Sequence, residues 1–363
     1  MELSKPDSNV LKGAAILMMV MLHLFARKNV GDLYYAEPLI GGAPWVYYLA
    51  IMGDACRQIY LFVTGYAFYL MVTNANGSLL GKNLKRIAKL YVNFWVVFLI
   101  FVPIGMMIGD ERVFTPDIGR FVLGFLGISN AYNGAWWFLR VYVILVLLSP
   151  VLIRFIKRQP SILLLACSCV LFVFGHFQRY RPFLDVGDHV VVADLANLCW
   201  LLATSQFSFV IGAVFAKEKL LTRIGNAFAN VRYKNFLCIS VLAALVVFHG
   251  MVQSSIVAPF NSTVMIVAYT LMTKHKVVTN VLHYFSKHST NIWLMHMFFY
   301  LTIFPDITFA PKYPVLIFLW LLLMCIAVSY VVKFITHPLH RMIERSSFFS
   351  RRAIAEHPLM KST

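Results

Sequence analysis

Long apolar runs separated by short polar segments dominate the pattern of this chain. Ten runs of about 17–25 mostly apolar residues are long enough for a helix to cross a bilayer. They lie at 10–27, 52–73, 88–109, 136–157, 160–179, 195–216, 235–253, 256–272, 289–305 and 314–336. The apolar segment 118–130 is too short to span, and we expect an interfacial or re-entrant helix there. The pattern predicts an all-α integral membrane protein with about ten transmembrane helices.

The first run contains two residues that hydrocarbon does not tolerate well, Lys12 and His23. They lie eleven residues apart, and at ~100° per residue a helix returns to within roughly 20° of its starting direction over that distance. The two side chains are therefore expected on one face, separated by roughly 16 Å along the axis. Polar groups on one face of a membrane helix usually point to a bundle interior or a water-filled cavity. The alternative is that Lys12 snorkels to the headgroups and His23 is a hydrogen-bonded packing histidine.

Composition supports the membrane assignment. Apolar residues make up 60% of the 363 residues and charged residues 13%, whereas a soluble domain carries about 25% charged residues. The mean hydropathy is +0.74. A formal charge of +17 could suggest nucleic acid, but the basic residues lie in short loops between apolar runs and not on a soluble face. We expect a lipid bilayer and no nucleic acid as partner.

Lysine and arginine alternate between the two sides of the predicted membrane. Loops on the side of the N-terminus carry 23 of them, and loops on the opposite side carry seven. The positive-inside rule therefore places both the N-terminus and the C-terminus in the cytoplasm.

This orientation assigns a depth to each polar residue within the runs. Lys12 lies at the cytoplasmic end, while His23, Asp54, Arg57 and Arg140 are expected as a cluster in the outer half of the membrane. As an alternative, Asp54 and Arg57 form a private ion pair at positions i and i+3.

Other residues of the runs carry weaker expectations. Trp136 and Trp137 are expected in an aromatic belt at the outer interface, and His296 near the middle of the ninth run. All six cysteines lie in or beside apolar runs, and no zinc ligand set or other metal site is visible. The histidines of the predicted cytoplasmic loops and tail are expected to face solvent or headgroups. They are His275, His283, His288, His337 and His340.

These residue types suit group transfer from a long anionic donor. Lys12, together with Lys85, Arg86 and Lys89 of a basic cytoplasmic loop, could hold phosphate groups. His23 is a natural base near neutral pH. Arg57 or Arg140 could stabilise the oxyanion of a tetrahedral state.

Several segments, in order, resemble the signature of the acyltransferase-3 family of membrane acyltransferases. LKGAAILMMVMLHLF resembles the family's Arg-x10-His helix, with Lys12 in place of the arginine. RQIYLFVTGYAFYL resembles its second helix, with Thr64 in place of a serine. The further segments are NLKRIAKLYVNFW, WWFLRVYVILVLLSP, SKHSTNIWLMHMFF and HRMIERS. The order of the set makes the resemblance specific.

The resemblance implies an acetyl-CoA-dependent O-acyltransferase of the bacterial inner membrane, with a surface or exported polysaccharide or a lipid-linked glycan as acceptor. Acyl-CoA is then a co-substrate, and no bound cofactor is expected. The family-like domain covers 1–345, a basic cytoplasmic tail covers 346–363, and no fused SGNH-type domain is expected. Catalytic roles are expected for His23, Arg57 and Asp54. Arg140, Trp137, Thr64 and His296 are expected to line the site.

Two other function classes stay open. Buried basic residues in a many-helix bundle also suit a transporter or exporter of a small anion or a lipid-linked sugar, although no internal repeat is visible. A scaffold or sensor is the third class. Within the enzyme hypothesis, direct transfer and relay through an acyl-histidine are both compatible with the sequence.

Overall fold

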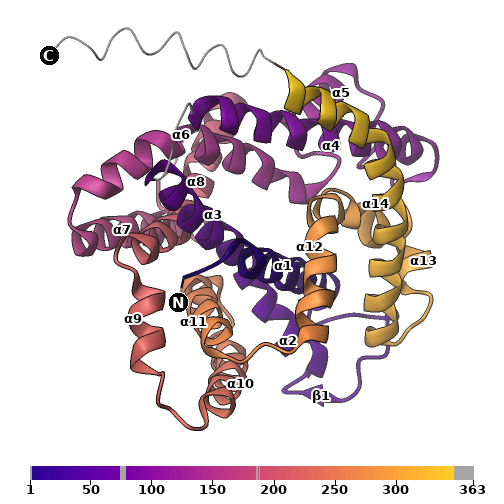
Figure 1. Cartoon of the computed structure of the whole chain (residues 1–363). Helices are drawn as coiled ribbons and strands as arrows, with labels where there is room; N and C mark the ends of the chain where they lie inside the picture. Colours follow the sequence, from indigo (N-terminus) through magenta and orange to yellow (C-terminus); the bar gives the residue numbers. More distant parts are fainter. Residues whose placement is uncertain (1, 74–78, 185–186, 188, 347–363) are drawn as a thin grey trace, which may run out of the picture. The chain divides into compact units, whose positions relative to one another are not determined.

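Helices make up most of the computed structural model, which describes residues 2–73, 79–184, 187 and 189–346 (Figure 1). The α-helices are α1 Lys5–Phe25, α2 Trp45–Ile51, α3 Ala55–Thr73, α4 Leu79–Ile108, α5 Ile118–Phe125, α6 Trp137–Arg158, α7 Ser161–Tyr180, α8 Val190–Lys217, α9 Leu220–Ala227, α10 Lys234–Val252, α11 Ala258–Leu271, α12 Lys276–Met297, α13 Pro305–Phe309 and α14 Pro314–Arg345. Short 3-10 helices occupy Met52–Asp54 (η1), Gly134–Trp136 (η2) and Ser255–Val257 (η3), and a π-helical turn (η4) covers Phe298–Thr302. The strands Leu39–Ile40 (β1) and Ala43–Pro44 (β2) form one small antiparallel hairpin.

Seven helices of the described part are long and apolar enough to cross a membrane. They are α1, α4, α6, α7, α8, α10 and α14. The other three predicted runs fold as α3, α11 and α12, which are shorter or more polar. The prediction of an all-α, multi-pass membrane protein is confirmed, with the count of ten as an approximation.

The chain divides into two compact units, which we describe separately. The first unit contains residues 1–70 and 153–289, and the second contains 71–152 and 290–363. Within the first unit, α7 pairs with α8, α1 packs against α2 and η1, and α10 packs against α11. Within the second unit, α4 pairs with α14. Residues 347–363, nearly all of the predicted basic tail, lie outside the described part.

Two glycines allow α3 and α8 to cross closely in the first unit. A Cβ atom at Gly65 would lie 1.9 Å from the carbonyl oxygen of Phe209, and one at Gly212 would lie 2.0 Å from that of Phe62. Backbones approach this closely in membrane helices only where small residues meet. Gly65 belongs to the Thr-Gly-Tyr segment next to the predicted site residue Thr64, so this contact fixes the helix that carries Arg57 and Thr64.

Polar side chains join the helices of the second unit. The side-chain amide of Asn93 donates to the side-chain oxygen of Asn291 (2.8 Å), and the side-chain N–H of Asn291 donates to the hydroxyl oxygen of Ser329 (3.0 Å). These bonds link α4, α12 and α14. Interhelical hydrogen bonds of this kind stabilise membrane bundles, because lipid offers no competing partner.

Trp136 belongs to the core of the second unit. It is 2% exposed, its indole N–H donates to the carbonyl of Leu294 (2.9 Å), and its ring contacts Phe94, Phe98 and Phe298. The prediction that Trp136 lies in an interfacial aromatic belt is therefore wrong. A buried tryptophan is tolerated here because its N–H finds a backbone acceptor.

The ninth predicted run is shifted along the chain. Helix α12 begins at Lys276 and ends at Met297, whereas the hydropathy pattern predicted a span at 289–305 with a loop before it. His288 is consequently 2% exposed on this helix, and the prediction of a solvent-facing residue is wrong.

His337 and His340 lie on α14, which continues to Arg345 instead of ending near residue 336. Both extensions carry many polar and exposed residues, which lower the hydropathy signal, so the sequence pattern misses them.

Substitution of Gly65 with alanine is expected to destabilise the protein by about 1–3 kcal/mol or more, because the added methyl group overlaps the Phe209 carbonyl. Thermal unfolding in detergent measures this effect. Gly119→Ala on α5 is the matched control, since its nearest neighbour is a side-chain oxygen at 3.3 Å. Equal unfolding midpoints for the two variants would contradict the close crossing.

Candidate functional site

Lys12 and His23 lie on one uninterrupted helix, α1. Two residues between them on the same face, Ile16 and Met19, are 0% and 7% exposed. The face therefore points into the protein, while Lys12 and His23 themselves are half-buried. Burial of the intervening residues supports the inward-facing stripe over the alternative in which Lys12 only snorkels to the headgroups.

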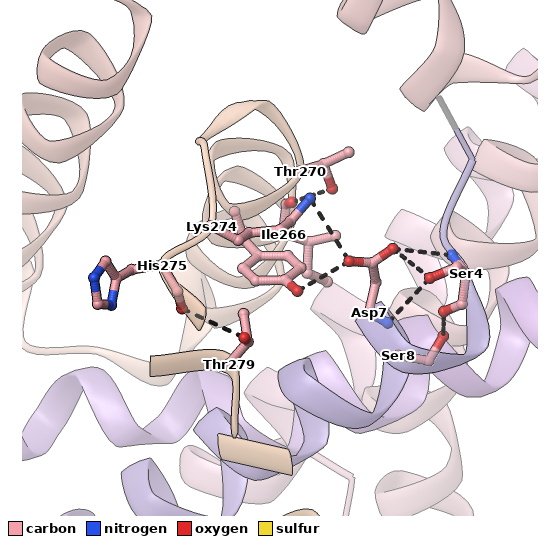
Figure 2. Close-up of polar contacts among 9 residues, drawn as sticks. Ser4, Asp7, Ser8, Ile266, Thr270, Lys274, His275 and Thr279 are labelled. Atoms are coloured by element: carbon pink, nitrogen blue, oxygen red, sulfur yellow. Dashed lines mark hydrogen bonds and ion pairs between the residues drawn. The ribbon is translucent and has the colours of Figure 1, made fainter. Parts of the chain in front are cut away.

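The N-terminal end of α1 is anchored through Asp7 (Figure 2). Ser4 caps the helix, with its hydroxyl oxygen accepting from the Asp7 backbone N–H (3.2 Å). The Asp7 carboxylate also accepts from the hydroxyl of Tyr269 (3.0 Å) and lies 3.6 Å from the ammonium of Lys274. Tyr269 lies on α11 and Lys274 just after it, so these contacts hold the N-terminal end of α1 against α11.

Helix α3 contributes a second half-buried stripe. Arg57, Tyr60 and Thr64 follow at i, i+3 and i+7 and share one face. The Tyr60 hydroxyl donates to the backbone carbonyl of Lys12 (3.1 Å), which ties this face to α1. Thr64 donates to the Tyr60 carbonyl of its own helix (2.7 Å), so its hydroxyl hydrogen is already used. The sequence interpretation missed Tyr60, although its helical spacing from Arg57 and Thr64 was a usable signal.

Asp54 lies at the end of η1, on the turn that precedes α3. Its carboxylate oxygen Oδ2 is 3.2 Å from Nε2 of His249 on α10, a partner that the sequence interpretation did not anticipate. Arg57 lies within electrostatic range of Asp54, Arg179 and Tyr180. The first unit therefore gathers two guanidinium groups and one carboxylate near the start of α3. Arg179 was counted only as a loop charge at the sequence level.

The predicted donor-binding lysines contact the end of α14 in the second unit. Lys85 donates to the backbone carbonyl of Glu344 (2.8 Å), and Lys89 forms an ion pair with the Glu344 carboxylate. Arg86 is 3.5 Å from the side-chain oxygen of Asn83, at the limit of a hydrogen bond. These residues lie on α4 and not in the predicted loop, and an anionic donor there would meet three cations whose net charge Glu344 reduces.

The second unit also holds the remaining predicted site residues. His296 is fully buried, and its Nδ1 donates to the backbone carbonyls of Ile292 (3.1 Å) and Trp293 (2.9 Å), which fixes the protonated nitrogen. Trp137 and Arg140 are half-buried near the start of α6. The proximity of Arg140 to His23 stays a prediction.

The groups that could hold a cosubstrate in the described part are cationic side chains. No group of three or more His, Cys, Asp or Glu side chains within these residues is arranged to hold a metal ion. Lys12, Lys85, Arg86 and Lys89 are the residues suited to phosphate groups.

Comparison with protein families gives one match. The model of an acyltransferase domain, that of the acyltransferase-3 family, matches residues 6–334, which is most of the chain. No curated protein and no solved structure matches the chain. The matched range includes α1 with Lys12 and His23, the α3 stripe and the basic segment of α4. The chain therefore belongs to the acyltransferase-3 family of membrane acyltransferases.

Proposed function

We propose that this membrane acyltransferase transfers an acyl group, most simply acetyl, from acyl-CoA to a hydroxyl group of a surface or exported polysaccharide. The observation that carries the proposal is α1, which presents a cation and a histidine on one inward face at two depths. A donor held at the cytoplasmic end and an acceptor entering from the outer side would meet along this face. The proposed location is the inner membrane of a bacterium.

The donor end would consist of Lys12 and the basic segment of α4. CoA carries phosphate groups and a long flexible arm that ends in the thioester. Lys85, Arg86 and Lys89 lie on the first turns of α4, where they could attract the phosphates as the donor approaches. Lys12 carries the same charge as an arginine but cannot bind phosphate in a bidentate manner, so we assign it a role as a point charge.

His23 would act as the general base. It removes the proton from the acceptor hydroxyl while the hydroxyl oxygen attacks the thioester carbonyl. Collapse of the tetrahedral state breaks the carbon–sulfur bond, and the thiolate of CoA leaves and receives a proton. The products are an O-acyl sugar and CoA, with His23 returned to its neutral form. A relay through acyl-His23 would use the same donor and acceptor in two steps.

Arg57 would stabilise the negative charge of the tetrahedral state. A fixed guanidinium in a site with little water is effective for this purpose, because it needs no reorganisation during the reaction. Arg57 lies on the half-buried face of α3 that is hydrogen-bonded to α1 through Tyr60. Asp54, within electrostatic range of Arg57, would hold this cation in place.

Substitution of His23 with alanine is expected to lower kcat by about 10²–10⁴-fold, the usual contribution of a general base. The measurement is incorporation of label from [¹⁴C]acetyl-CoA into polysaccharide by purified protein in proteoliposomes. His283→Ala on α12 is the matched control, as a half-buried histidine outside the proposed site. The assignment of His23 fails if both variants label the polysaccharide at the wild-type rate.

Substitution of Arg86 with alanine is expected to raise the KM for acetyl-CoA by about tenfold with little change in kcat, since it removes a charge that binds donor in ground state and transition state alike. Steady-state kinetics at varied acetyl-CoA measures the split. Arg232→Ala removes a cation from the segment between α9 and α10 and serves as the control. A fall in kcat at unchanged KM would exclude the donor-binding role.

A further inference from the structure

Two buried polar side chains on α10 and α11 lie beside the half-buried Asp54 of η1 in the first unit. His249 is 1% exposed and Asn261 is 0% exposed. Nε2 of His249 lies 3.2 Å from the Asp54 carboxylate and 3.0 Å from the carbonyl of Ile51, and its Nδ1 lies 3.3 Å from Nδ2 of Asn261. The catalytic scheme above leaves both His249 and Asn261 without a role.

The neighbours of His249 define its hydrogen-bonding state. Nε2 faces two acceptors, a carboxylate and a carbonyl, so it carries the proton and donates. Nδ1 faces the amide nitrogen of Asn261, which can only donate, so Nδ1 accepts. The ring is then oriented with its protonated Nε2 toward Ile51 and Asp54. Both ring nitrogens are engaged, and the ring is buried, which excludes His249 itself as the base that meets a substrate.

The Asp54 carboxylate depends on this histidine. Its other oxygen, Oδ1, is buried and has no hydrogen-bond partner among the described residues. Removal of the imidazole would take away the hydrogen bond to the Ile51 carbonyl and the close polar neighbour of the partly buried Asp54 carboxylate, and the loss of both is costly. Asn261 orients His249, and His249 orients Asp54.

The turn that carries Asp54 also touches the helix of the proposed base. A Cβ atom at Gly53 would lie 2.2 Å from the backbone carbonyl of Met18 and 2.7 Å from Cβ of Leu22 on α1. Leu22 immediately precedes His23. Arg57 follows Asp54 by three residues, so the two side chains lie on one side of the junction between η1 and α3. A shift of the Asp54 side chain would therefore act on the region that contains Arg57 and His23.

We propose that His249, held in one tautomer by Asn261, is a positioning residue for the acyl transfer: it fixes the Asp54 carboxylate and, through it, the Arg57 guanidinium. The inference rests on the proposed function, because it concerns the outer half of the same site. In this proposal α10 and α11 help to position the residues that stabilise the transition state. Neither helix contacts the substrate.

The test compares His249→Ala and His249→Gln with the wild-type protein in the proteoliposome assay, using [¹⁴C]acetyl-CoA and the polysaccharide that the wild type labels. His249→Ala is expected to lower kcat roughly 10- to 100-fold, the effect expected when a charged group loses a close polar partner. The KM for acetyl-CoA is expected to change less than about twofold, because the donor residues are elsewhere. Glutamine can place an N–H near the position of Nε2, so His249→Gln is expected to recover most of the lost kcat.

Two controls separate positioning from general damage to the fold. Ser168→Ala removes a hydrogen bond of similar burial between α7 and α8, the one from Ser168 to Gln206 (2.6 Å), and is expected to leave kcat unchanged. The double variant Asp54→Asn/His249→Ala is expected to be no slower than the slower single variant, since both changes break one interaction. Thermal unfolding of each variant reports its folding.

Three results would overturn the inference. His249→Ala could keep a kcat within about twofold of wild type, or the losses from Asp54→Asn and His249→Ala could multiply. If His249→Ala does not fold, a folded His249→Gln with a loss as large as that of Asp54→Asn also contradicts it. If the wild-type protein labels no polysaccharide, both the proposed function and this inference are overturned. If the wild-type protein is active and any of the three results is found, only this inference is overturned.

Discussion

A helix that crosses a membrane can carry polar side chains only where protein covers them, and this constraint governs α1. The helix holds Lys12 and His23 on a face whose intervening residues, Ile16 and Met19, are buried. Such an arrangement is stable only if α1 keeps its depth and its rotation. Asp7 fixes the N-terminal end of α1 on Tyr269 and Lys274, Tyr60 holds the carbonyl of Lys12, and Gly53 lets η1 pack against the turn before His23.

The sequence predicted those parts of the structure that depend on apolar periodicity and helical geometry. The all-α membrane class and the shared face of Lys12 and His23 both follow from the spacing of residues along one helix. Orientation in the membrane rests on the distribution of Lys and Arg and stays a prediction. The extension of α12 back to Lys276 and of α14 to Arg345 was missed, because these turns carry many polar and exposed residues that lower the hydropathy signal.

Partners between distant segments could not be predicted from one sequence. Asp54 and Arg57 suggested a local pair, yet the carboxylate meets His249, nearly two hundred residues away. The sequence suggested that Lys85 and Lys89 bind only the acyl donor, yet both side chains contact Glu344. Trp136 read as an interfacial residue, yet a backbone acceptor at Leu294 allows it to be buried. In each case a buried or partly buried polar group is satisfied by tertiary structure, which hydropathy and spacing do not encode.

The account divides the reaction between two ends of one helix, with donor charge at the cytoplasmic end and the base in the outer half. Sealed membrane vesicles of known orientation test this division most directly, with [¹⁴C]acetyl-CoA outside the vesicles and polysaccharide acceptor either inside or outside. The account predicts label on the acceptor only in inside-out vesicles and only when the acceptor is inside. Equal labelling in right-side-out vesicles, or labelling that requires donor and acceptor on the same side, would contradict it.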